Sequence, residues 1–89
     1  MAKVFVTDRE NKATIKVFAV NSESKADLVY QEVRSEYQAK TDGDWFYVNS
    51  ESNATSVLYW VTQESKADVK VFKSNKSKWL KSNKFINRF

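Results

Sequence analysis

Residues 20–27 read Val-Asn-Ser-Glu-Ser-Lys-Ala-Asp, a pattern that occurs five times in this chain. The other copies are 6–14 (VTDRENKAT), 33–40 (VRSEYQAK), 48–55 (VNSESNAT) and 61–68 (VTQESKAD). Each copy places an alanine six or seven residues after a valine; these alanines are Ala13, Ala26, Ala39, Ala54 and Ala67. Their spacing is 13, 13, 15 and 13 residues. A nearly constant period predicts a fold wound from similar units, and it indicates architecture more strongly than function.

Apolar segments lie between the copies, at 14–19, 27–32, 55–60 and 68–73. β-Branched and aromatic residues dominate them, which favours short strands. In the first segment the apolar alternation changes parity after Val17, and this predicts a bulge or bend in each strand. Two columns of the repeat are expected to form the core layers. They are Val17, Tyr30, Trp45, Leu58, Val71 and, next to them, Phe18, Gln31, Phe46, Tyr59, Phe72.

The connecting segments are polar and contain almost no glycine, so we expect turns or single helical turns capped by serine and asparagine. The one glycine, Gly43, falls in the two-residue insertion that makes the third step 15 long. Asp42-Gly43 is a favoured tight-turn pair. The repeat alanines are interpreted as crowded positions that exclude larger side chains.

Taken together, the pattern predicts a mainly β fold: short curved strands in about five 13-residue pseudo-repeats, wound into one domain over residues 1–89. The pseudo-repeats occupy 4–74, and a basic, aromatic C-terminal segment follows at 73–89. In that segment Trp79, Ile86 and Phe89 could share one face of a short helix.

Composition narrows the function classes. The 89 residues include no cysteine and no histidine, so disulfides, thiol nucleophiles and the commonest transition-metal ligands are absent. An enzyme would have to work with Ser, Lys, Tyr or carboxylates, and we expect a non-enzymatic protein without a cofactor. There is no apolar run long enough to span a membrane and no signal-peptide pattern at the start. A soluble, cytoplasmic monomer without membrane association is therefore expected, with its partners unknown.

Three features together resemble the septoil-knot family of small bacterial domains. They are the repeated V-x-S-E-x-x-A unit, the Asp-Gly insertion before an aromatic cluster (42–47), and the ending 79–89 with its Asn-Arg-aromatic close. The resemblance covers nearly the whole chain and implies short β-segments wound into a seven-crossing torus knot. Gln63 and Arg9 depart from the repeat, both within turns. The family's function is uncharacterised, so the resemblance implies no catalytic residues.

Several polar columns are candidate sites. Glu23, Glu36, Glu51 and Glu64 recur in one column and could bind a hard cation, but a solvated rim partly neutralised by Lys12, Lys25 and Lys66 is the favoured interpretation. Asp42 and Asp44, on either side of Gly43, are a similarly weak candidate for a cation site, and we interpret them as part of a turn. Ser22, Ser35 and Ser50 have no histidine to activate them and are expected to cap turns. The aromatics Trp45 and Tyr59 are expected in the core rather than in a stacking site for bases or sugars.

The C-terminal segment carries the strongest functional signal. Residues 1–72 hold nine basic and eleven acidic side chains, whereas the segment holds six basic ones and no acidic one: Lys73, Lys76, Lys78, Lys81, Lys84 and Arg88. These cations could bind phosphates while Trp79, Phe85 or Phe89 stack on single strands. The alternative is that the aromatics anchor the segment in the core and the lysines extend into solvent. A compact structural or interaction domain is the preferred function, and weak, non-specific nucleic-acid binding is the alternative.

Overall fold

Seven short strands form the regular structure of the computed structural model, which describes residues 2–89. They are β1 (Ala2–Val6), β2 (Ile15–Ala19), β3 (Leu28–Glu32), β4 (Asp44–Tyr47), β5 (Ser56–Trp60), β6 (Val69–Lys73) and β7 (Lys78–Trp79). Five single-turn 3-10 helices separate the first six strands: η1 (Glu10–Lys12), η2 (Glu23–Lys25), η3 (Glu36–Gln38), η4 (Glu51–Asn53) and η5 (Glu64–Lys66). The mainly β fold of repeated strand-and-turn units is therefore confirmed, and the strands expected from the apolar segments lie within one residue of their observed positions.

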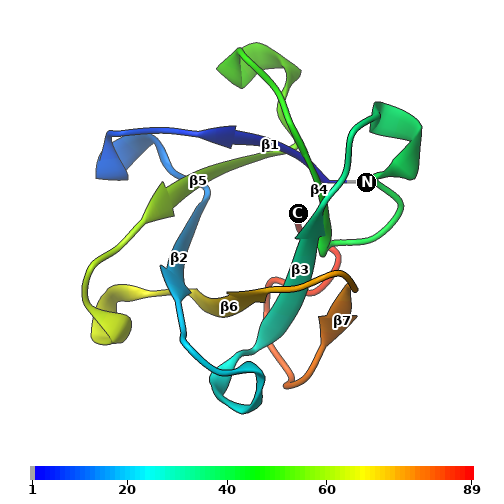
Figure 1. Cartoon of the computed structure of the whole chain (residues 1–89). Helices are drawn as coiled ribbons and strands as arrows, with labels where there is room; N and C mark the ends of the chain where they lie inside the picture. Colours follow the sequence, from blue (N-terminus) through cyan, green and yellow to red (C-terminus); the bar gives the residue numbers. More distant parts are fainter. Residues whose placement is uncertain (1) are drawn as a thin grey trace.

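The first six strands close into a barrel. They lie side by side in the order β4-β1-β5-β2-β6-β3, and β3 also pairs with β4. All of these pairs are parallel. Seen along its axis, the barrel is a ring of strands with the 3-10 turns outside it (Figure 1). Because every strand runs the same way, all strands begin at one end of the barrel and finish at the other.

The chain goes round this barrel more than once. Each strand is followed by one that lies two places further round, except that β4 lies directly beside β3. The first circuit consists of β1–β3 and the second of β4–β6, and each strand of the second circuit lies between two strands of the first. Every barrel pairing joins one of β1–β3 to one of β4–β6, and the paired residues are 43 or 52 positions apart, or 13 between β3 and β4.

The barrel interior holds two rings of side chains. One ring contains Ala2, Ile15, Leu28, Gly43, Ser56 and Val69, and all are buried. The other contains Val4, Val17, Tyr30, Trp45, Leu58 and Val71, also all buried. The column of Val17, Tyr30, Trp45, Leu58 and Val71 is thus confirmed as a core layer.

The second predicted core layer is wrong. Phe18, Gln31, Phe46, Tyr59 and Phe72 are only half-buried and lie on the outer face of the barrel, opposite the interior rings. No change of parity occurs in β2, where buried and half-buried residues alternate from Ile15 to Phe18. The prediction failed because a parallel sheet is covered on both faces, so apolar residues appear on both. Tyr59 correspondingly lies outside the core that encloses Trp45.

Each connection between strands two places apart must cross the strand that lies between them. At the end of each crossing, the threonine or aspartate directly after the repeat alanine makes two hydrogen bonds to one residue of the crossed strand. Asp68, for example, donates its N–H to the Lys16 carbonyl (2.7 Å) and accepts the Lys16 N–H on its carboxylate (2.9 Å). The other pairs are Thr14 with Val57, Asp27 with Lys70 and Thr55 with Lys3. The residue after four of the five repeat alanines therefore has a structural function that the sequence analysis left unassigned.

The polar connectors form the single helical turns that were expected, and each repeat alanine closes its turn by donating its N–H to the first glutamate's carbonyl. The serines do not cap them as predicted. Ser22, Ser35 and Ser50 stand at the cap positions without a side-chain capping bond. The Ser50 hydroxyl bonds instead to the Ser52 hydroxyl (3.3 Å). The alanines also differ in burial: Ala26 and Ala39 are buried, whereas Ala13, Ala54 and Ala67 are half-buried.

The insertion at Asp42-Gly43 forms a turn, as expected, but glycine is needed there for lack of space. Gly43 does not have a positive φ, so its backbone conformation does not require glycine. A Cβ on Gly43 would lie 2.3 Å from the Ser77 hydroxyl oxygen and 2.8 Å from the Val29 carbonyl oxygen. Gly43 therefore permits the C-terminal segment and β3 to approach it closely.

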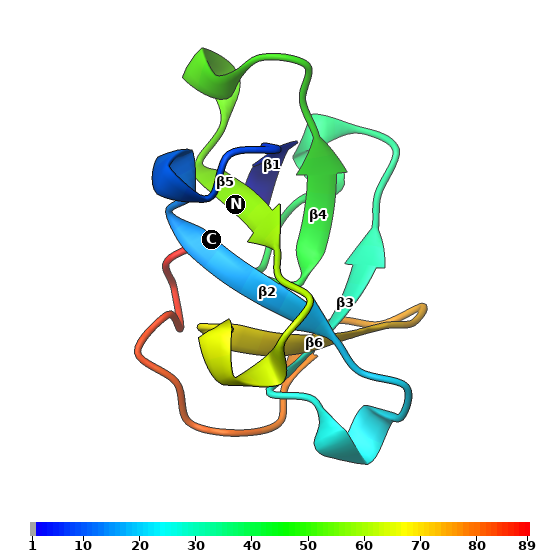
Figure 2. The same ribbon diagram turned by 90° about the vertical axis from the view of Figure 1, so that its left-hand side faces the viewer.

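The C-terminal segment closes the end of the barrel where the strands begin, at the left in Figure 2. Its β7 pairs antiparallel with β3, and its backbone and side chains bond to Asp27, Asp42 and Asp68 before the strands. The predicted helix is wrong, since residues 80–89 contain turns and no helix. Phe89 is buried, and its ring lies 5.8 Å from that of Trp45.

Candidate functional site

The six cations of the C-terminal segment divide into two groups. Lys73 pairs with Glu32 (3.0 Å) and Lys76 with Glu23 (3.1 Å). Among residues 2–89, no ion pair is formed by Lys78, Lys81, Lys84 or Arg88, all of which are exposed. The Lys84 ammonium lies 5.4 Å from the centre of the Phe85 ring. We call these four side chains the cationic end group.

The aromatic side chains of the same segment are turned toward the barrel. Phe89 belongs to the core, and Trp79 and Phe85 pack against it. The Trp79 indole N–H donates to the Asp42 carboxylate (2.9 Å). These rings are therefore engaged with the protein, while the exposed apolar side chain of the segment is Ile86.

The column of glutamates lies on the outer turns. Glu36, Glu51 and Glu64 are exposed and Glu23 is half-buried. Within residues 2–89, no three His, Cys, Asp or Glu side chains are placed to hold one metal ion. Two of the glutamates form ion pairs, Glu64 with Lys70 (3.3 Å) and Glu23 with Lys76. The neutralising lysines predicted in the turns, Lys12, Lys25 and Lys66, do not form these pairs.

Asp42 and Asp44 have structural roles at the insertion. The Asp42 carboxylate accepts hydrogen bonds from Trp79 and from the backbone of Asn87. The Asp44 carboxylate accepts from Gln31 and from both the backbone and the hydroxyl of Thr41. With these donors already in place, the two carboxylates hold the C-terminal segment and the turn.

A polar cluster lies at the barrel end where the strands finish. The Tyr47 hydroxyl donates to the Glu32 carboxylate (2.7 Å), which also pairs with Lys73. This hydrogen bond and then Lys73 lower the pKa of Glu32, although partial burial acts in the opposite direction. Burial and the same carboxylate raise the pKa of Tyr47, and burial raises that of Tyr30 to about 12. At neutral pH Glu32 is therefore ionised and Tyr47 is protonated.

This cluster reinforces the junction between the two circuits. β3 and β4 share only two paired positions, Gln31 with Asp44 and Glu32 with Trp45. Side chains add further links across it: Tyr47 to Glu32, Gln31 to Asp44, and the stacked rings of Tyr30 and Trp45 at 3.8 Å. We call this set the β3–β4 clasp.

The clasp predicts a pH-dependent contribution to stability. Because the folded protein lowers the pKa of Glu32, its stabilisation is present above the ordinary value of 4.5 and disappears as pH falls through the lower folded value. We expect Glu32→Gln to lower the urea midpoint at about pH 7 and to approach the wild type at about pH 3. Tyr47→Phe, which removes the hydroxyl alone, should show the same trend with a smaller loss. An equal deficit at both pH values would contradict this assignment.

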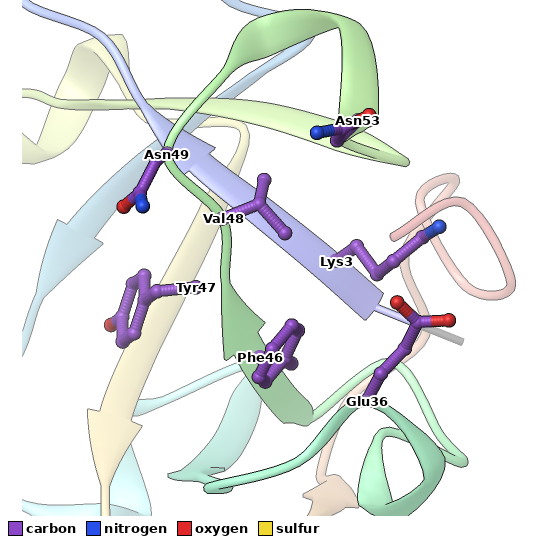
Figure 3. A pocket seen from close by; sticks show the side chains of 7 residues that line it. All are labelled: Lys3, Glu36, Phe46, Tyr47, Val48, Asn49 and Asn53. Atoms are coloured by element: carbon purple, nitrogen blue, oxygen red, sulfur yellow. The ribbon is translucent and has the colours of Figure 1, made fainter.

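A groove opens on the outer wall of the barrel beside β4, between η3 and η4 (Figure 3). Its volume is about 440 Å³. It is lined by Phe46, Tyr47, Val48, Asn49, Asn53, Lys3 and Glu36. Phe46 and Val48 lie on the same side of β4 as Asn53, Lys3 and Glu36, and the Lys3 and Glu36 side chains point toward each other, whereas Tyr47 and Asn49 lie on the opposite side (Figure 3). The sequence analysis missed this groove because it placed Phe46 in the core. We call it the β4 groove.

The architecture defines a class of protein: a closed parallel barrel of short strands wound from 13-residue units, with a polar turn outside each crossing. The chain belongs to the septoil knot family. The family model described as "7(1) septoil knot domain" matches residues 1–79. Neither a curated protein nor a solved structure gave a match.

The match confirms the family resemblance found in the repeats. It also leaves most of the cationic end group outside the matched residues, since Lys81, Lys84 and Arg88 lie beyond 79. No helix among residues 2–89 is long and apolar enough to cross a bilayer.

Proposed function

We propose that this chain is a non-catalytic interaction domain, a rigid barrel that presents a binding surface on its outer wall. The observation that carries the proposal is the β4 groove, which opens on the outer wall between η3 and η4 beside the half-buried Phe46 and Val48. Binding sites are commonly concave and place polar groups beside apolar side chains, and the volume of this groove lies within their usual range. The filled interior rings leave the outer wall as the place for a partner.

The protonation states of the polar clusters also favour binding over catalysis. A general acid or base works best when its pKa lies near the operating pH. The surroundings of Glu32 and Tyr47 move their pKa values away from neutrality in opposite directions. Asp42 and Asp44 already accept hydrogen bonds from the protein.

Crosslinking in the native cell, followed by purification of the tagged full chain, tests this function. We expect the wild type to retain a defined partner at a constant ratio. An unrelated small domain with the same net charge of +4 is the control for non-specific retention. Identical sets of proteins on the two baits would contradict the proposal.

Weak nucleic-acid binding through the cationic end group is the second candidate, and it rests on the division of the six cations. Changing Lys78, Lys81, Lys84 and Arg88 together to glutamine should abolish binding to single-stranded RNA. The matched variant Lys73→Gln/Lys76→Gln should bind as the wild type does, because those lysines are already paired with glutamates. Affinity should fall with salt by a log-log slope of about −0.7 for each phosphate contacted. Equal losses in the two variants, measured by fluorescence anisotropy, would contradict this role.

We further propose that the two interleaved circuits make the chain a knot, as family membership implies. Threading must then precede many native contacts, in addition to the loop closure that already slows parallel pairing. Newly synthesised protein should acquire protease resistance over seconds to minutes or longer. A circular permutant that opens the chain between β3 and β4 should fold much faster than the natural order. Equal folding rates for the two orders would contradict a threading step.

A further inference from the structure

The third of the repeated turns, η3, differs from the other four in the residue at its centre. That residue is Tyr37, whereas the equivalent residues of η1, η2, η4 and η5 are Asn11, Ser24, Ser52 and Ser65. Tyr37 is 75% exposed, and the next most exposed large apolar side chain of residues 2–89 is Val6 at 42%. A single exposed apolar side chain is ordinary in itself. This one is informative because four equivalent turns form with a small polar residue in its place.

Contacts within the protein do not account for the tyrosine. Among residues 2–89, the Tyr37 side chain forms no hydrogen bond, ion pair or ring contact. Most of its surface is in water, so it adds little to the buried apolar area. The ring is therefore available to another molecule.

The backbone that carries Tyr37 is held in place. Before the turn, the Val33 N–H donates to the Trp45 carbonyl (2.8 Å). The Gln38 side chain accepts the Arg34 N–H across the turn (3.2 Å). The turn packs against β4 and projects outward from the ring of strands (Figure 1). A side chain presented on a fixed turn loses little backbone freedom when a partner binds.

The charges that flank Tyr37 also differ from those of the other turns. Arg34 follows the first valine of its unit, where the other copies have Thr7, Asn21, Asn49 and Thr62. Lys40 follows the repeat alanine, at a position that needs no crossing bond because this connection crosses no strand. Both cations are exposed, and neither forms an ion pair among residues 2–89. Since Glu36 faces Lys3 (Figure 3), the remaining charge around Tyr37 is positive.

We propose that η3 is the surface through which this domain contacts a partner protein, with Tyr37 inserted into an apolar pocket whose rim carries aspartate or glutamate. Tyrosine and arginine are enriched among the residues that contribute most to protein interfaces. Arg34 and Lys40 complement an acidic rim. Glu36 of the same turn lines the β4 groove, so the contact is continuous with that groove. The inference rests on the proposed interaction function and assigns the chemistry of the partner.

A protein fits this surface better than a nucleic acid does. The exposed Glu36 directly precedes Tyr37, and its carboxylate repels phosphates. Proteins that bind single strands stack successive bases on several aromatic side chains. The next most exposed aromatic ring among residues 2–89 is that of Tyr47, which is 39% exposed and bonded to Glu32.

Photocrosslinking from the turn itself tests the contact in the native cell. Benzoylphenylalanine replaces Tyr37 in the tagged full chain and, as the matched control, Ser65 at the centre of η5. We expect one protein adduct of defined mass from position 37 and none from position 65. Mass spectrometry should place the attachment in a partner segment where apolar residues lie beside aspartate or glutamate. No adduct from position 37, equal adducts from both positions, attachment away from acidic residues, or an adduct that nuclease removes would overturn the inference.

The crosslinked protein, once purified, is the ligand for an affinity measurement by calorimetry. Tyr37→Ser installs the residue that η2, η4 and η5 already carry, so the fold should tolerate it, and binding should weaken at least about ten-fold. Arg34→Glu/Lys40→Glu should also weaken binding. Lys25→Glu/Lys66→Glu makes the same change of net charge on two other turns and should leave the affinity close to that of the wild type. Unchanged affinity in Tyr37→Ser, or equal losses in the two charge variants, would contradict the assignment.

The tagged chains separate the surface from the function that it serves. If Tyr37→Ser retains the same partner as the wild type at the same ratio, the interaction function stands and its assignment to η3 is wrong. If the wild type retains no defined partner, the proposed function fails as well.

Discussion

Replacing Trp45 with alanine is expected to cost about 3 to 5 kcal/mol of folding free energy, the range found for buried aromatic truncations. Trp45 is fully buried in the barrel interior. Its ring stacks on Tyr30 at 3.8 Å and lies 5.8 Å from Phe89, so one side chain joins the β3–β4 junction to the C-terminal segment. Its indole N–H donates to the Asp42 carbonyl (2.8 Å), a bond that alanine also removes.

Urea denaturation followed by circular dichroism measures this loss. Trp45→Phe is the matched control, since it keeps an aromatic ring between Tyr30 and Phe89 while removing the indole N–H. It should retain much of the stability that Trp45→Ala loses. A wild-type midpoint for Trp45→Ala would show that the interior is not packed around this residue.

Placing a charge at Ala26 is expected to destabilise the protein by more than about 2 kcal/mol. Ala26 has no exposed surface. It precedes Asp27, whose carbonyl accepts N–H groups of Leu80 and Lys81, so the C-terminal segment lies close to this turn. Aspartate at this position would bury an unpaired carboxylate.

Ala67→Asp is the matched control because it makes the same change in an equivalent but half-buried turn. A carboxylate there can reach solvent, so the loss should be clearly smaller. The repeat alone predicts equal effects at the two alanines, whereas the structure predicts unequal ones. Equal urea midpoints for the two variants would contradict the packing around Ala26.

The sequence predicted the strand-and-turn unit well because small and β-branched residues recur at fixed positions in each unit. Val17 and its equivalents were correctly placed inside. The outer column could not be told from the inner one, since Phe18 and Phe46 are as apolar as many core residues and a parallel barrel is covered on both faces. Lys3, Lys16 and Lys70 each lie two residues before an outer phenylalanine and so share its face of the strand. These lysines were a signal of the outer face that hydrophobicity alone does not give.

Other features depend on how the circuits are arranged rather than on any single unit. The Thr or Asp after four of the repeat alanines, replaced by Lys40 in the fifth, was visible in the sequence but had no meaning until crossings were known. The β4 groove lies beside the one connection that advances by one strand instead of two, and Glu36 of that connection is part of its lining. The predicted C-terminal helix failed because β3, Asp42 and Asp27 offer the segment backbone and side-chain partners that replace helical ones.

The separation of paired strands also governs how this protein can be made by a ribosome. While residues 2–40 leave the exit tunnel, β1, β2 and β3 have no barrel partners among themselves, because all of those partners begin at Asp44 or later. The nascent first half must therefore remain an open chain during translation, with its apolar segments kept apart by charged turns. Folding has to wait until nearly the whole polypeptide has been released, and its success in the cell depends on how long that exposed first half escapes aggregation and proteolysis.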